Sequence, residues 1–134
     1  MCLFGDPVIK AFEREIDDLL SEYRGYSFYG KIKKTLVYEL KGAQRNDTDR
    51  FSAFASSVDK RQWAMAKTSS VAFDLISSGE YHIMDQLTPE GKQLVAFYKK
   101  TLKRAMGCRY IDGATYFQQI ANIDKQVIET GKWS

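Results

Sequence analysis

The chain has 134 residues, of which 44% are hydrophobic, and its formal net charge is +3. The length suits one domain, and 8 Phe, 8 Tyr and 2 Trp residues argue against disorder. The small charge is far from the basic bias of a dedicated nucleic-acid coat. Two cysteines beside an ample core indicate free thiols, so we expect a cytoplasmic protein. No apolar run is long enough to cross a membrane, and no signal peptide is visible at Met1 to Gly5.

The first predicted helix runs from Asp6 to about Arg24. Pro7 follows Asp6, and a proline at the first helical position loses no helical hydrogen bond. Gly25 is a natural stop for this helix. Apolar residues three and four apart form one face. The opposite face is acidic and carries Glu13, Glu15, Asp17, Asp18 and Glu22.

Residues 26–42 fit two periodicities. Apolar residues three and four apart favour a helix that ends at Gly42, whereas alternate residues from Tyr26 onward fit a strand. We predict a helix because the neighbouring segments are helical and a lone hairpin is only marginally stable. A small β element within residues 26–40 is the alternative.

The longest predicted helix runs from about residue 49 to residue 78. Its apolar residues keep a nearly continuous spacing of three and four, and Gly79 ends it. Two short runs of hydroxyl residues, Ser56–Ser57 and Thr68–Ser70, are the places where this helix would kink or divide.

Two further helices are predicted after a connector at Glu80–Leu87. One runs from Pro89 to Met106, behind the capping residue Thr88, and the other from about Gly113 to Thr130. The sequence therefore predicts a single all-α domain over residues 1–134. We expect a compact bundle of about five amphipathic helices with one long central helix.

The sequence carries no recognisable metal or cofactor motif. It has no HExxH, CxxC or Glu-x-x-His spacing and no glycine-rich phosphate loop, so we expect neither a metal nor a cofactor. A small enzyme would have to be built around His82 or Cys2. That interpretation is the weakest, because the neighbours of His82 in sequence do not establish a catalytic geometry and no base can be named for Cys2.

Basic residues gather in two places. On the Pro89–Met106 helix, residues four apart form two adjacent basic ridges. These ridges consist of Lys99, Lys100, Lys103 and Arg104. The second cluster follows the aromatic stretch 26–29 and consists of Lys31, Lys33 and Lys34. Cations beside aromatic rings can follow a phosphate backbone and stack bases, which suggests a nucleic-acid-binding accessory protein. Alternatively, these lysines form solvated faces, or the acidic first helix pairs with the basic helix.

Two aromatic residues, Trp63 and Phe97, lie beside the main apolar stripes of their helices. Exposed aromatic rings are favoured anchors at protein interfaces, although a widened core stripe would also place them there. Together with the missing catalytic motifs, they favour a non-enzymatic interaction or regulatory protein. We expect it to dock a helical face on a protein partner or on its own copy, with nucleic-acid binding as the second hypothesis.

Overall fold

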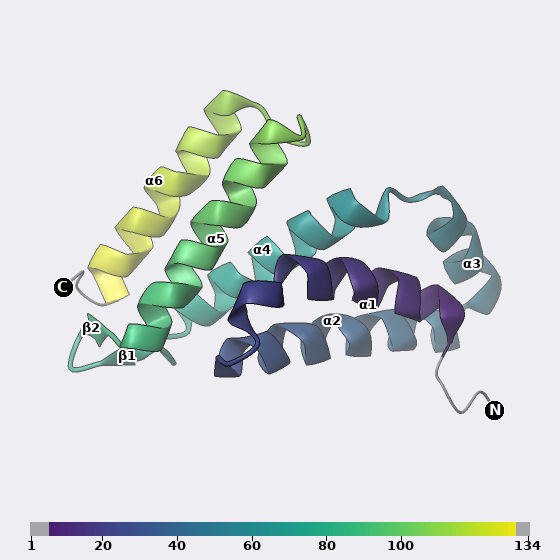
Figure 1. Ribbon diagram of the computed structural model, residues 1–134, viewed down its shortest axis with the longest axis horizontal. Helices are drawn as coiled ribbons and strands as arrows, with labels where there is room; N and C mark the ends of the chain where they lie inside the picture. The colour runs from purple at the N-terminus through teal and green to yellow at the C-terminus, as the bar shows by residue number, and fades with distance from the viewer. Residues whose placement is uncertain (1–5, 131–134) are drawn as a thin grey trace. The chain divides into compact units, whose positions relative to one another are not determined.

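The computed structural model describes residues 6–130, with side chains through Val127, and confirms the all-α fold class. Its six α-helices are α1 (Pro7–Leu19), α2 (Ser27–Asn46), α3 (Thr48–Ser57), α4 (Lys60–Ser77), α5 (Pro89–Gly107) and α6 (Gly113–Thr130) (Figure 1). The chain divides after Thr68 into two compact units, the N-terminal unit and the C-terminal unit, and α4 begins in the first and ends in the second. The single-domain organisation stays a prediction.

Helix α1 begins where the sequence predicts. The Asp6 carboxylate accepts hydrogen bonds from the backbone N–H groups of Val8 and Ile9, at 2.8 and 3.3 Å. These bonds satisfy donors that have no partner inside the helix. The predicted apolar face is buried and consists of Ile9, Phe12, Ile16 and Leu19. The helix ends at Leu19, earlier than predicted, and a 3₁₀ turn, η1 (Ser21–Tyr23), leads to Gly25.

Residues 27–46 form the continuous helix α2, which confirms the helical prediction. The alternative β element within residues 26–40 is wrong. One face of α2 is buried, and it consists of Phe28, Ile32, Leu36 and Leu40. The helix continues past Gly42 because Ala43, Gln44 and Arg45 favour helical backbone and a single glycine only weakens it.

The long helix predicted for residues 49–78 is divided. Val58 has extended backbone, with φ −76° and ψ 142°, so α3 ends at Ser57. The Ser57 hydroxyl donates to the carbonyl of Ala53 at 3.0 Å, and Asp59 Oδ1 accepts the N–H of Gln62 at 3.0 Å. The hydrogen bond of the Ser57 side chain to the last turns of α3 and the Asp59 cap at the start of α4 together favour the break. It lies directly after Ser56–Ser57, one of the two expected places.

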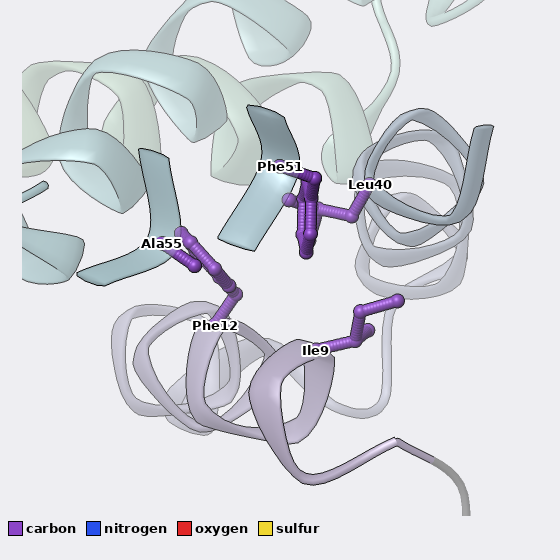
Figure 2. Close-up of a cluster of buried hydrophobic side chains, with 5 residues drawn as sticks. All are labelled: Ile9, Phe12, Leu40, Phe51 and Ala55. Carbon is purple, nitrogen blue, oxygen red and sulfur yellow. The ribbon is translucent and has the colours of Figure 1, made fainter. Parts of the chain in front are cut away.

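Part of the core of the N-terminal unit is a cluster contributed by α1, α2 and α3. Figure 2 shows side chains of these helices converging on one another. The cluster consists of Ile9, Phe12, Leu40, Phe51 and Ala55, with Val37, Val58 and Trp63 packed against it. Full burial of one large apolar side chain contributes about 1.5–3 kcal/mol, so this cluster is a principal source of the unit's stability.

The C-terminal unit contains the helix pair α5 and α6, which run side by side (Figure 1). Thr88 Oγ1 accepts the N–H of Gly91 at 2.9 Å and begins α5, while Asp112 Oδ1 accepts the N–H of Thr115 at 2.7 Å and begins α6. Both starts were predicted. Helix α5 buries a wide face, from Leu94 and Val95 to Ala105.

The segment Glu80–Leu87, which the sequence predicts to be a simple connector, contains a small β hairpin. Its strands are β1 (His82–Ile83) and β2 (Gln86–Leu87), paired with His82 opposite Leu87. The two loop residues, Met84 and Asp85, have φ values of 52° and 62°. Both positive angles are those of a tight hairpin turn that usually carries Asn-Gly. The sequence lacks that signal, so the hairpin was not predicted.

Candidate protein-docking site

A pocket of about 420 Å³ opens on the N-terminal unit. Its apolar lining comes from α2, α3 and α4, and consists of Leu40, Ala43, Phe51, Phe54 and Trp63. The volume lies near the lower end of the range of about 300–1,000 Å³ typical of ligand sites. A space of this size and lining suits one or two apolar side chains better than a large polar cofactor.

Aromatic packing fixes the wall of the pocket. Phe12 is completely buried, and its ring contacts those of both Phe54 and Trp63. The Phe54 ring stacks on it with centroids 5.8 Å apart and planes 5° apart. The ammonium group of Lys60 lies 5.3 Å from the Phe12 ring centroid and donates to the carbonyl of Ala55 at 2.8 Å. Because the wall rests on the buried core, the pocket exists before any partner binds.

Charged residues line the pocket alongside the apolar ones. They are two acids and two bases, Glu39, Asp47, Arg50 and Lys67, and all four are exposed. Asp47 Oδ1 already accepts the backbone N–H of Arg50 at 3.0 Å, as the N-cap of α3. The charges therefore balance, and the pocket favours neither a strongly acidic nor a strongly basic partner.

The two predicted interface aromatics differ in their exposure to solvent. Trp63 is half-buried and lines the pocket. Phe97 is completely buried, so its ring is not the exposed anchor that the sequence suggested. The reason is the wide buried face of α5, which extends beyond the stripe of Leu94, Tyr98 and Leu102. Sequence reasoning missed Phe54, because its spacing placed it in the core stripe of a continuous helix.

The basic cluster on α2 is partly neutralised by α1. Lys33 Nζ lies 3.0 Å from Asp17 Oδ1 and 3.9 Å from Glu13 Oε2, and the Tyr29 hydroxyl donates to Asp17 Oδ1 at 2.9 Å. Burial lowers the pKa of Lys33, but the hydrogen bond and the charge of Asp17 outweigh it and raise the pKa overall. The other members, Lys31 and Lys34, are half-buried and exposed respectively. Acidic residues of α1 thus form ion pairs with Lys33 of α2.

The basic cluster on α5 is not one uniform surface. Lys99 Nζ lies 2.8 Å from Asp124 Oδ1 of α6, so this cation contributes to the contact between the two helices. Lys100 and Lys103 are exposed, and Arg104 is half-buried. The structure therefore brings part of the predicted cluster to the surface of the C-terminal unit.

His82 and Cys108, which bear on catalysis or metal binding, lie at different elements of the fold. His82 lies half-buried in β1, and Cys108 is an exposed free thiol after α5. Cys2 lies outside the described residues. Among the side chains that the structure describes, from Asp6 through Val127, no three of His, Cys, Asp or Glu are grouped so as to hold a metal ion. None of the helices described there is both long and apolar enough to cross a membrane.

Comparison with known proteins assigns no function. The chain matches no family model, no curated protein and no solved structure.

Proposed function

We propose that this protein is a non-enzymatic interaction module that docks a protein partner in the pocket of its N-terminal unit. The observation that carries the proposal is a preformed apolar pocket of about 420 Å³ with Phe54 and Trp63 at its surface. Interface energy concentrates in a few well-packed aromatic anchors that exclude water. A partner side chain seated between these rings would gain that contribution.

The rigidity of the pocket supports a binding role. Phe54 and Trp63 both contact the buried Phe12 ring, so they lose little conformational freedom when a partner binds. Three helices surround the space, an arrangement suited to an amphipathic helix that inserts apolar residues into a groove. The charged residues around it would fix the orientation of such a helix.

The chemistry of the lining supports binding over catalysis. The residues that line the pocket include no histidine, cysteine or serine, and the Asp47 carboxylate is engaged as a helix cap. A general base and a nucleophile within hydrogen-bond reach of each other are the minimum for most covalent mechanisms. The free Cys108 thiol suits a reducing compartment, so we place this docking in the cytoplasm.

Site-specific photo-crosslinking tests the proposal. A benzophenone amino acid replaces Asn46, which lines the pocket, or Thr35, which is exposed on the same helix but does not line it. Illumination of cells that express each protein should give a discrete protein adduct from position 46 and none from position 35.

A matched pair of variants makes this test specific. Ala43→Glu places a charge in the pocket without removing a core side chain, whereas Ala53→Glu adds the same charge at an exposed position of α3 outside it. The adduct should disappear with Ala43→Glu and persist with Ala53→Glu. Adducts that are absent, or equal for both probe positions, would refute the docking role.

A second candidate function is nucleic-acid contact through α5. It is supported by the exposed Lys100 and Lys103, which project from the basic helix beside Arg104. Fluorescence anisotropy with single- and double-stranded oligonucleotides should then show binding that weakens steeply with salt, because phosphate contacts release counterions. The double variant Lys100→Glu/Lys103→Glu should abolish it. Absence of binding at low salt would eliminate this candidate.

A further inference from the structure

We infer that the solvent-facing side of α2 binds single-stranded nucleic acid. This surface and its class of partner both differ from those of the docking role. Exposed residues four, three and four positions apart form one line along the helix, which we call the α2 stripe. The stripe consists of Lys34, Tyr38, Lys41 and Arg45. None of these residues lines the pocket.

The α2 stripe carries charge of one sign only. At about 100° per residue, its three cations lie within about 60° of Tyr38 around the helix and span about 16 Å along its axis. Within Ser27–Asn46, all of which the structure describes, the only acidic residue is Glu39, about 100° from Tyr38. The acids of α1 pair with Lys33, which lies about 140° from Tyr38. The stripe is therefore complementary to a chain with a negative charge at each repeat.

An exposed aromatic ring lies in the middle of the stripe. Tyr38 stands between Lys34 and Lys41, and 74% of its surface is exposed. Single-stranded bases stack on aromatic rings of this kind, while cations beside the rings follow the phosphates. Each nucleotide of a single strand offers both a flat base and a phosphate. A base stacked on Tyr38 would bring the neighbouring phosphates toward the cations on either side.

Other polyanions would use only part of this surface. A helix that lies in a membrane interface inserts its apolar face, but that face of α2 is packed in the core, where Phe28, Ile32 and Leu36 are completely buried. An acidic peptide would meet the cations but offers no ring for each charge. A duplex keeps its bases stacked on one another, whereas a single strand has bases free to stack on Tyr38.

The stripe differs from the cluster that the sequence suggested. Of that cluster, Lys33 pairs with Asp17. The preceding aromatic stretch is also engaged, because Phe28 is completely buried and the Tyr29 hydroxyl donates to Asp17. The ring available for stacking is instead Tyr38, which lies further along the helix and is flanked by cations on both sides.

Fluorescence anisotropy of the full chain with labelled oligothymidylate or oligouridylate of about 12 nucleotides tests the inference. Three phosphate contacts predict an affinity that falls with salt with a log–log slope of about −2. Lys34→Glu/Lys41→Glu should weaken binding by at least about tenfold at low salt, because it reverses two of the three cations. The matched control is Lys100→Glu/Lys103→Glu, which reverses two exposed charges on α5 and should retain binding. The second candidate function predicts the opposite result for these two variants.

Substitutions of Tyr38 separate stacking from charge. Tyr38→Ala should weaken binding by at least about fivefold and leave the salt slope unchanged, whereas Tyr38→Phe should bind like the wild type. Inorganic polyphosphate has phosphates but no bases, so calorimetry should show equal binding to the wild type and to Tyr38→Ala. Circular dichroism of every variant should match that of the wild type, because all the substituted positions of the stripe are exposed.

Several outcomes would overturn the inference. They are absence of oligonucleotide binding at low salt, equal or greater weakening by the α5 variant, binding indifferent to Tyr38→Ala, and tighter binding of a duplex of the same length. The crosslinking probe at position 46 reports on the pocket, which the stripe residues do not line. The docking role therefore stands or fails by a separate measurement.

Discussion

The ring of Phe12 meets the indole of Trp63 edge to face, with centroids 4.9 Å apart and ring planes at 69°. This geometry is among the favoured arrangements of aromatic pairs. Phe12 belongs to the buried cluster of α1, α2 and α3, whereas Trp63 lies in the first turns of α4 and lines the pocket. One ring contact therefore joins the core of the N-terminal unit to the surface proposed for docking.

Phe12→Ala should destabilise the protein strongly, because it removes a completely buried ring and leaves a cavity under Phe54 and Trp63. We expect a loss of about 3–5 kcal/mol in the free energy of unfolding, measured by urea denaturation. Phe117→Ala is the control, since 70% of Phe117 is exposed, and it should stay within about 0.5 kcal/mol of the wild type. Equal effects of the two substitutions would contradict the described core.

Gly91→Ala and Gly42→Ala should change stability in opposite directions. A Cβ at Gly91 would lie 2.6 Å from the carbonyl oxygen of Tyr81 and 3.1 Å from Leu87 Cδ2, so backbone must move. Such overpacking costs about 1–3 kcal/mol. A Cβ at Gly42 meets nothing within 4 Å, and alanine there should stabilise α2 by about 0.5–1 kcal/mol. Thermal unfolding of both variants measures the contrast, and a stabilising Gly91→Ala would show that the hairpin does not approach α5.

The cap of α1 should make stability depend on acid pH. Hydrogen bonds to the Asp6 carboxylate lower its pKa below 3.8. The largest effect comes from Gln44 Nε2, which donates at 2.8 Å, and the next largest from the N–H of Val8. A carboxylate whose pKa is lower in the folded state contributes stability above pH 3.8, and this contribution is lost as the pH falls through the folded pKa. The stability difference between wild type and Asp6→Asn should therefore shrink in acid.

NMR titration of the Asp6 carboxyl carbon checks the cause of this dependence. The midpoint should lie below 3.8 in the wild type, and Gln44→Met should raise it, because the largest cause of the lowered pKa is removed. A midpoint that Gln44→Met leaves in place would assign the lowered pKa to the backbone N–H donors alone.

Helix starts could be predicted from the sequence because capping is local. Asp6, Thr88 and Asp112 each bond to a backbone N–H two or three residues ahead, so a short stretch of sequence contains the whole interaction. Residues 26–42 were predicted correctly on other grounds, namely the helical neighbours and the marginal stability of a lone hairpin, and the helix buries Phe28, Ile32, Leu36 and Leu40 on one face. Periodicity alone did not reveal the break at Val58, which depends on the Asp59 cap and left the apolar spacing undisturbed.

The candidate site could be predicted only in part. Trp63 and Phe97 have similar positions beside their helical stripes, yet one lines a pocket and the other is completely buried. The difference depends on how much of each helix surface is covered by other elements, which is a property of tertiary packing. The pocket itself needs α2, α3 and α4 to be placed together, and no local pattern in the sequence specifies that placement.

The hairpin turn should be open to stabilisation by substitution. Met84 and Asp85 both have positive φ, a conformation that costs most residues about 1–2 kcal/mol. The double variant Met84→Asn/Asp85→Gly supplies the residues that favour this turn, and it should stabilise the protein by roughly 1–2 kcal/mol. Gly79→Ala is the control, and it should have the opposite effect on stability. Gly79 has a φ of 79° with open space around its Cβ position, so alanine should destabilise through backbone strain alone. Chemical denaturation measures both, and an Asn-Gly turn that leaves stability unchanged or lowers it would contradict the described turn.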